Sequence, residues 1–130
     1  MSDRSRIPPL SSFEEEIGFT RAIRVGDRIL VSGTTANLPD GTVPVEAGAQ
    51  ADIIFAEIIR HIEELGGKAE HVVRVRMFVT DIADADAVSA SFARHMKVAR
   101  PTATLVAISA LYRPEWKVEI EAEAVVPAGE

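Results

Sequence analysis

The sequence predicts a single α+β domain in which a mixed β-sheet carries two helices on one face. The 130 residues are enough to bury one core without disulfides. Apolar residues make up 47% and charged residues 26%, which is ordinary for a globular protein. Segments of period two alternate with two segments of helical period in the order ββαβαββ. Helices segregated from a sheet in this way form a two-layer sandwich.

The domain is predicted to span residues 18–127, after an irregular N-terminal arm at residues 1–17. Pro8-Pro9 and the acidic run Glu14–Glu16 oppose any regular element in that arm. The first two strands follow within residues 19–34 and are joined by a tight turn at Gly26-Asp27.

The first helix is predicted from apolar residues that recur at helical spacing, namely Ala51, Ile54, Phe55, Ile58, Ile62 and Leu65. The run indicates a helix of about 18 to 20 residues. Gly66-Gly67 ends it, where a left-handed cap is expected.

The second half of the chain adds a strand, a helix and two strands. Residues 71–80 are β-branched and apolar, and Asp81 offers an N-cap to a second apolar helical stripe. Residues 102–111 and 116–126 are predicted as two strands lying edge to edge. One face of such a sheet lacks helices, so other copies of the chain are expected to cover it.

Composition argues against several classes of function. The net charge of −6 and the absence of basic runs disfavour a nucleic-acid partner. No segment approaches the roughly 20 apolar residues of a membrane span, and the N-terminus lacks the apolar core of a signal peptide. A cytoplasmic protein without a membrane partner is therefore expected. Without cysteine, and with three dispersed histidines, no metal site is predicted.

Three carboxylates share one face of the last strand. Glu119, Glu121 and Glu123 alternate with apolar residues, as the side-chain period of a strand requires. One interpretation is a solvated face whose acids pair with Arg74 and Arg76. The other is that one glutamate lies in a cleft, where desolvation raises its pKa toward values useful for acid–base chemistry.

Five segments, in order and at consistent spacing, resemble the RidA family, also called YjgF or L-PSP "endoribonuclease". They are residues 18–22, 29–34, 79–82, Arg100-Pro101 and 118–122. The resemblance covers nearly the whole chain from about residue 17 to 126. It implies a chorismate-mutase-like fold assembled as a homotrimer, with small-molecule clefts between subunits. It also implies hydrolysis of reactive enamines and imines without a metal or organic cofactor.

The resemblance assigns site residues by position. Glu119 matches a glutamate thought to position water, and Ser32, Gly33 and Thr34 match a loop that lines the cleft. The remaining matches are Phe19 at a tyrosine position, Ser89 at a position often held by asparagine, and Ala103 with Leu105 on the strand that follows Arg100-Pro101.

Ala103 departs from the family pattern R-P-x-R-T, whose second arginine grips a substrate carboxylate. An unpaired carboxylate in a partly dry pocket costs several kcal/mol. The sequence thus predicts a divergent member that binds a small metabolite and hydrolyses an imine or enamine other than the usual 2-imino acids. The alternative is a non-catalytic ligand sensor or protein-interaction trimer. Ribonuclease activity ranks below both.

Overall fold

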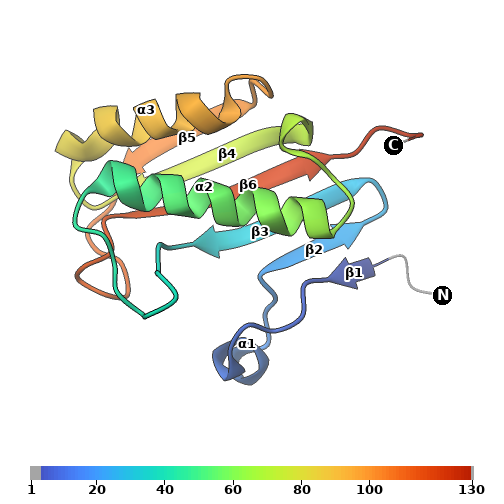
Figure 1. Ribbon diagram of the computed structural model, residues 1–130, viewed down its shortest axis with the longest axis horizontal. Coiled ribbons are helices and arrows are strands. Elements are labelled where there is room, and N and C mark those ends of the chain that lie inside the picture. Colours follow the sequence, from blue (N-terminus) through green and yellow to red (C-terminus); the bar gives the residue numbers. More distant parts are fainter. Residues whose placement is uncertain (1–3, 130) are drawn as a thin grey trace.

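The structure, a computed structural model, describes residues 4–129 (Figure 1). Its helices and strands follow in the order β1 (Arg4–Arg6), α1 (Ser12–Ile17), β2 (Ala22–Val25), β3 (Arg28–Thr34), α2 (Ala47–Glu64), β4 (Val72–Val79), α3 (Ala85–Met96), β5 (Thr102–Ala107) and β6 (Val118–Val125). Short 3₁₀ turns at Ala69–His71 and Ile82–Asp84 precede β4 and α3.

The six strands form one mixed sheet in the order β1-β2-β3-β6-β4-β5. All neighbouring pairs are antiparallel except β4 and β5, which are parallel. Helices α2 and α3 lie together on one face of the sheet, as Figure 1 shows. The predicted α+β sandwich with two helices on one face is therefore confirmed.

The last two strands do not lie edge to edge, which corrects the sequence prediction. Strand β4 pairs with β5 on one side and with β6 on the other, so it separates them. A parallel pair needs a crossover, and α3 supplies it between β4 and β5. Periodicity identified both strands but carried no information on which strand each would pair with.

The N-terminal arm is more regular than the sequence indicated. Strand β1 pairs with β2, and α1 follows it. The Glu14 carboxylate accepts hydrogen bonds from the backbone N–H groups of Leu10 (2.9 Å) and Ser11 (3.1 Å), which caps the start of α1. Gly18 ends the helix at φ +96°. The acidic run, interpreted as a helix breaker, in fact supplies the cap.

The core lies between the sheet and α2, whose inward stripe includes Ile54, Phe55, Ile58 and Ile62, each fully buried. Gly66 closes α2 at φ +88°, as predicted. An added Cβ there would lie 2.8 Å from Nη1 of Arg24, so the position tolerates only glycine without rearrangement. Among the described residues, no helix has the length and apolar character needed to cross a bilayer.

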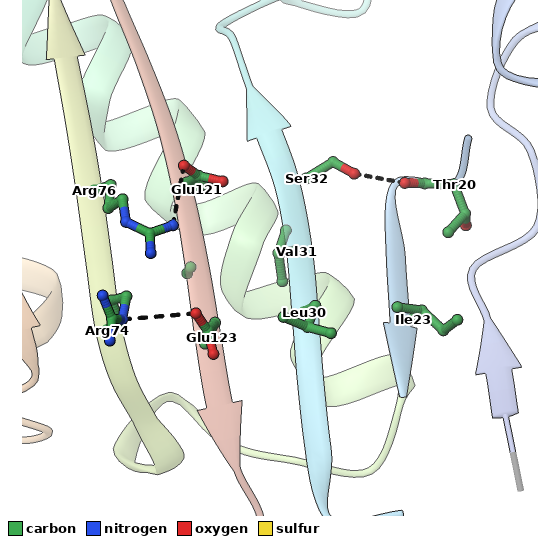
Figure 2. A pocket seen from close by; sticks show the side chains of 10 residues that line it. Thr20, Ile23, Leu30, Val31, Ser32, Arg74, Arg76, Glu121 and Glu123 are labelled. Atoms are coloured by element: carbon green, nitrogen blue, oxygen red, sulfur yellow. Dashed lines mark hydrogen bonds and ion pairs between the residues drawn. The ribbon is translucent and has the colours of Figure 1, made fainter. Parts of the chain in front are cut away.

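The face of the sheet opposite the helices, here called the open face, carries charges in cross-strand pairs (Figure 2). Arg76 lies beside Glu121 at 3.4 Å, and Glu123 lies 3.6 Å from Arg74 and 3.0 Å from Arg28. Apolar side chains such as Leu30 are partly exposed between these pairs. A hollow of about 210 Å³ lies among them.

Candidate functional site

Glu119 is the one glutamate of the alternating trio whose charge is not paired. The strand register explains why, because Glu121 and Glu123 lie opposite Arg76 and Arg74 of β4, whereas Glu119 lies opposite Phe78. Among the described residues, no cation lies within ion-pair distance of its carboxylate and no hydrogen bond reaches it. Of the two interpretations of the trio, pairing holds for two acids and not for Glu119.

The surroundings of Glu119 favour its neutral form. Burial raises the pKa of this carboxyl, the positive charge of Arg21 opposes that rise, and the nearby Glu121 adds to it. The carboxylate lies directly over Gly33, where an added Cβ would be only 2.5 Å from its Oε2 atom. Glycine at 33 therefore allows the carboxylate to approach the backbone of β3.

A β-bulge in β3 shapes the opposite wall. The register between β3 and β6 shifts between Val31 and Thr34, which takes Ser32 and Gly33 out of the regular ladder. The Nη2 group of Arg21 donates to the carbonyl of Gly33 and to Oγ1 of Thr34 (3.1 Å). The bulge thus fixes a guanidinium close to the backbone segment over which Glu119 lies.

A cavity of about 700 Å³, here called the aromatic pocket, opens between this bulge, α1 and the loop before β6. Its aromatic lining consists of Phe13, Phe19, Tyr112 and Trp116. Its charged and polar lining consists of Ser11, Glu14, Arg21, Ser32, Thr35, Asn37, Arg113 and Glu119, with Gly33. A large apolar cavity with a few convergent polar groups is the usual form of a small-molecule site.

The aromatic walls are held by ring contacts. Phe13 of α1 packs edge-on against Phe19, with the ring centroids 5.9 Å apart. The Arg21 guanidinium lies 5.7 Å from the centre of the Phe19 ring, and Arg113 lies 5.3 Å from that of Trp116. The short helix α1 therefore forms part of the pocket wall.

Two buried polar atoms on pocket residues have no hydrogen-bond partner among the described residues. They are Oε1 of Glu14 and Nε1 of Trp116. Buried polar groups are nearly always satisfied, so each is a contact that water or a ligand can supply.

The structure brings together four of the residues predicted from the sequence. Phe19, Ser32, Gly33 and Glu119 all line the aromatic pocket. Thr34 lies just behind it, where it contacts Arg21 and lines an adjoining cavity of about 380 Å³.

The other three predicted residues lie elsewhere in the single chain. Ser89 is exposed on α3, and Ala103 is exposed on β5. Leu105 of β5 packs against the core. Strand β5 is the far edge of the sheet, separated from β3 by β4 and β6, and none of the three residues lines the aromatic pocket of its own chain.

Sequence reasoning missed Arg21, Glu14, Tyr112 and Trp116 as pocket residues. Arg21 could have been found, because it follows Phe19 by two residues just before β2, a spacing that places both on one face of an extended chain. Trp116 precedes β6 and also lines the pocket.

His61 and His95 lie in the last turns of α2 and α3, and all three histidines are at least partly buried. His61 and His71 are 2% and 6% exposed, and His95 is partly buried. Burial lowers the pKa of His61, and the nearby Arg60 lowers it further. The described residues contain no group of three or more side chains suited to a metal ion.

The comparisons with known proteins agree with this architecture. The model of the family described as "Endoribonuclease L-PSP" matches residues 10–126. An uncharacterised protein of Streptomyces coelicolor is 32% identical over 92% of this chain and 90% of its own length. A RutC family protein of Pasteurella multocida is 30% identical over 82% of this chain and 86% of its own length.

Solved structures of similar proteins have the same fold as this chain. A Mycobacterium tuberculosis protein, Rv2704, described as a member of the YjgF/YER057c/UK114 family, has a TM-score of 0.86 and 32% identity, covering 95% of this chain and 99% of its own. A Pseudomonas aeruginosa protein of unknown function has a TM-score of 0.82 and 28% identity, covering 97% and 94%. With a family match over nearly its full length and a matching fold, this chain belongs to the L-PSP endoribonuclease family, the YjgF/RidA group.

Proposed function

We propose that this protein is a homotrimer that binds a small metabolite in the aromatic pocket and hydrolyses a carbon–nitrogen double bond with Glu119 as the acid–base group. The observation that carries the proposal is the state of Glu119. It alone among the three glutamates lacks a paired cation, and burial raises its pKa inside a cavity large enough for a small molecule.

Trimer formation is supported by the open face and by the position of β5. The open face is partly apolar and is not covered by helices of its own chain. Ser89, Ala103 and Leu105 lie too far from their own chain's aromatic pocket to line it. A neighbouring copy that brings its β5 edge to this pocket would place its exposed Ala103 near Phe19, Ser32, Gly33 and Glu119.

Hydrolysis of an imine matches what this carboxyl group can do. A water molecule adds to the carbon of the C=N bond, and the Glu119 carboxylate accepts a proton from that water. The protonated carboxyl returns this proton to nitrogen, which gives a carbinolamine. The carboxylate then transfers the hydroxyl proton of the carbinolamine to nitrogen, the C–N bond breaks as the C=O bond forms, and ammonia and a carbonyl compound leave. A raised pKa suits a group that must both accept and donate a proton near neutral pH.

The substrate is proposed to differ from the usual 2-imino acids. Ala103 cannot grip a carboxylate from β5, and Phe19 provides a ring without the hydroxyl expected at its position. The aromatic lining favours a substrate with a planar or apolar body.

The test is an imine-hydrolysis assay with Glu121→Gln as the matched control. Imines with and without a carboxylate are generated in situ by amino-acid and amine oxidases, and carbonyl release is followed with and without the protein. Glu119→Gln is expected to slow the reaction about 100-fold or more. Glu121 lies on the same strand and face but is paired with Arg76, so its variant should retain activity. Equal rates for wild type and Glu119→Gln would exclude the catalytic role.

A second candidate function is ligand sensing without turnover. The replaced positions, Phe19 and Ala103, leave a pocket that retains its aromatic walls but lacks two polar groups of the family pattern. Saturable ligand binding with no accelerated hydrolysis across the imine panel would favour this alternative.

A further inference from the structure

The aromatic pocket contains an arginine, Arg21, that forms no ion pair with a described carboxylate. Arg21 is half-buried, and burial lowers its pKa while the more distant Glu14 and Glu119 oppose that effect. Among the described residues, no carboxylate oxygen lies within ion-pair distance of its guanidinium. A guanidinium stays charged at physiological pH, so the charge persists in the pocket.

The contacts of Arg21 leave most of its donors available. Every hydrogen bond that it makes to a described residue uses Nη2, and all go to the neutral oxygens of the bulge. Nη1 and Nε have no partner among the described residues. Arg21 lines the aromatic pocket, so a ligand in that pocket lies next to this side chain.

Arg113, the other arginine of the pocket, is in a different state. One of its terminal nitrogens is paired with the carboxylate of Glu115, and the other donates to Asn37 at 3.3 Å. Its charge is therefore compensated within its own loop. Arg21 is the only pocket cation in the described chain that still lacks an anion.

We propose that Arg21 is the anion-binding residue of the aromatic pocket, and that the ligand is a small aromatic or planar compound with one carboxylate. The proposal rests on the proposed function only in taking this pocket as the ligand site, and it does not depend on turnover. The Arg21 guanidinium binds the carboxylate, and the body of the ligand packs against the rings of Phe19 and Trp116. The anion thus binds beside β2 and β3, on the wall that Arg21 forms, and not at residue 103 of β5.

Trp116 provides a direct readout, because it is the only tryptophan of the chain and lines the same pocket. The experiment titrates the full-length protein with benzoate and with benzamide, a neutral molecule of the same shape, and follows Trp116 fluorescence. Wild type is expected to prefer benzoate. In Arg21→Gln the affinity for benzoate should fall about 10- to 100-fold, the value of a charged hydrogen bond, while benzamide binding changes little.

Arg28→Gln is the matched control, since it removes one cation from β3 at a site outside the pocket. It should leave the preference for benzoate unchanged. If Arg21 only held the bulge in place, Arg21→Gln would weaken benzoate and benzamide equally, which would overturn the assignment. No saturable benzoate binding by wild type would overturn it as well.

A measurement on wild type keeps the test independent of how Arg21→Gln folds. In ¹⁵N-labelled protein, the Nε–H resonance of Arg21 is identified by its loss in Arg21→Lys. It should shift with benzoate and stay in place with benzamide, and equal behaviour with both would contradict the proposal. The two proposals can fail separately. If benzoate and benzamide bind equally well and hydrolysis still depends on Glu119, only the role of Arg21 is excluded. If benzoate binds selectively but no imine is hydrolysed, only the catalytic function is excluded.

Discussion

At the scale of single residues, the pocket concentrates groups in electrostatically unfavourable states. Glu119 and Arg21 attract each other electrostatically, but among the described residues neither forms an ion pair. Both contact the Gly33 segment, Glu119 over its Cα and Arg21 at its carbonyl oxygen. An ion pair between two such groups would be expected if the stability of the fold were the only requirement. Their lack of an ion pair is more typical of a site that binds a ligand.

The raised pKa of Glu119 leads to a prediction about stability. Because the folded state holds this proton more tightly than the unfolded chain, ionisation destabilises the fold above the unfolded pKa of about 4.3. Glu119→Gln should therefore be more stable than wild type at pH 7, and the difference should vanish below about pH 4. Urea unfolding at both pH values measures it. Glu121→Gln, which loses an ion pair, should show no gain at pH 7.

The close approach of Glu119 to Gly33 leads to a prediction about the position of the Glu119 carboxylate. An alanine there places a Cβ 2.5 Å from Oε2 of Glu119, so the flexible end of the glutamate must move away. Gly33→Ala is expected to reduce imine hydrolysis about 10-fold or more while the protein remains folded. In a Glu119→Ala background the obstructing carboxylate is absent, and the same change should have little further effect. A double-mutant cycle on rate and melting temperature checks this, and additive effects would contradict it.

At the scale of secondary-structure elements, α1 and the β3 bulge build the pocket, whereas α2 and α3 stabilise the layer on the opposite face. A polar cluster ties these two helices together. Asp52 of α2 accepts a 2.6 Å hydrogen bond from the buried hydroxyl of Ser91 and 3.0 Å contacts from Arg94 and His95 of α3. Burial acts to raise the pKa of Asp52, but these hydrogen bonds outweigh it and hold the pKa below its ordinary value.

Asp52→Asn is expected to destabilise the fold by about 1–3 kcal/mol, because the charged acceptor is lost and Ser91 is buried. The lowered pKa fixes the sign of the pH dependence. The contribution of Asp52 is present above the unfolded pKa of about 3.9 and is lost as pH falls through the lower folded value. Chemical unfolding between pH 2 and 7 should show wild type and variant converging in acid. Glu63→Gln, an exposed change on α2, should match wild type throughout.

At the scale of the whole molecule, the open face of the sheet is the surface that the single chain leaves uncovered. We predict a particle of three times the 14.1 kDa of the chain in sedimentation equilibrium. Leu30 is 39% exposed on this face, and Leu30→Asp should shift the particle toward monomer because it would place a charge in the proposed interface. Val45→Asp, at an exposed loop residue, should leave the mass unchanged. A monomeric wild type would contradict the trimer.

The sequence by itself determined the elements and their patterns. The predicted helix before Gly66-Gly67 and the alternation around Glu119 appear in the structure, because periodicity and end signals depend on neighbours close in the chain. The motifs also indicated the family. Two predictions from local signals were wrong. The acidic run suggested an irregular arm, but Glu14 caps α1. The last two strands were expected to pair with each other, but β4 lies between them.

Only the tertiary structure decided which glutamates of β6 form ion pairs with arginines. Glu119, Glu121 and Glu123 are equivalent in sequence, and strand order with register left the first opposite Phe78 while pairing the others with arginines. The bulge that holds Arg21 beside the pocket likewise depends on how β3 pairs with β6. These outcomes rest on contacts between residues distant in sequence, where a shift of one residue changes every partner. The sequence therefore supplies the carboxyl and guanidinium groups of the pocket, and the pairing between strands determines which of these groups form ion pairs.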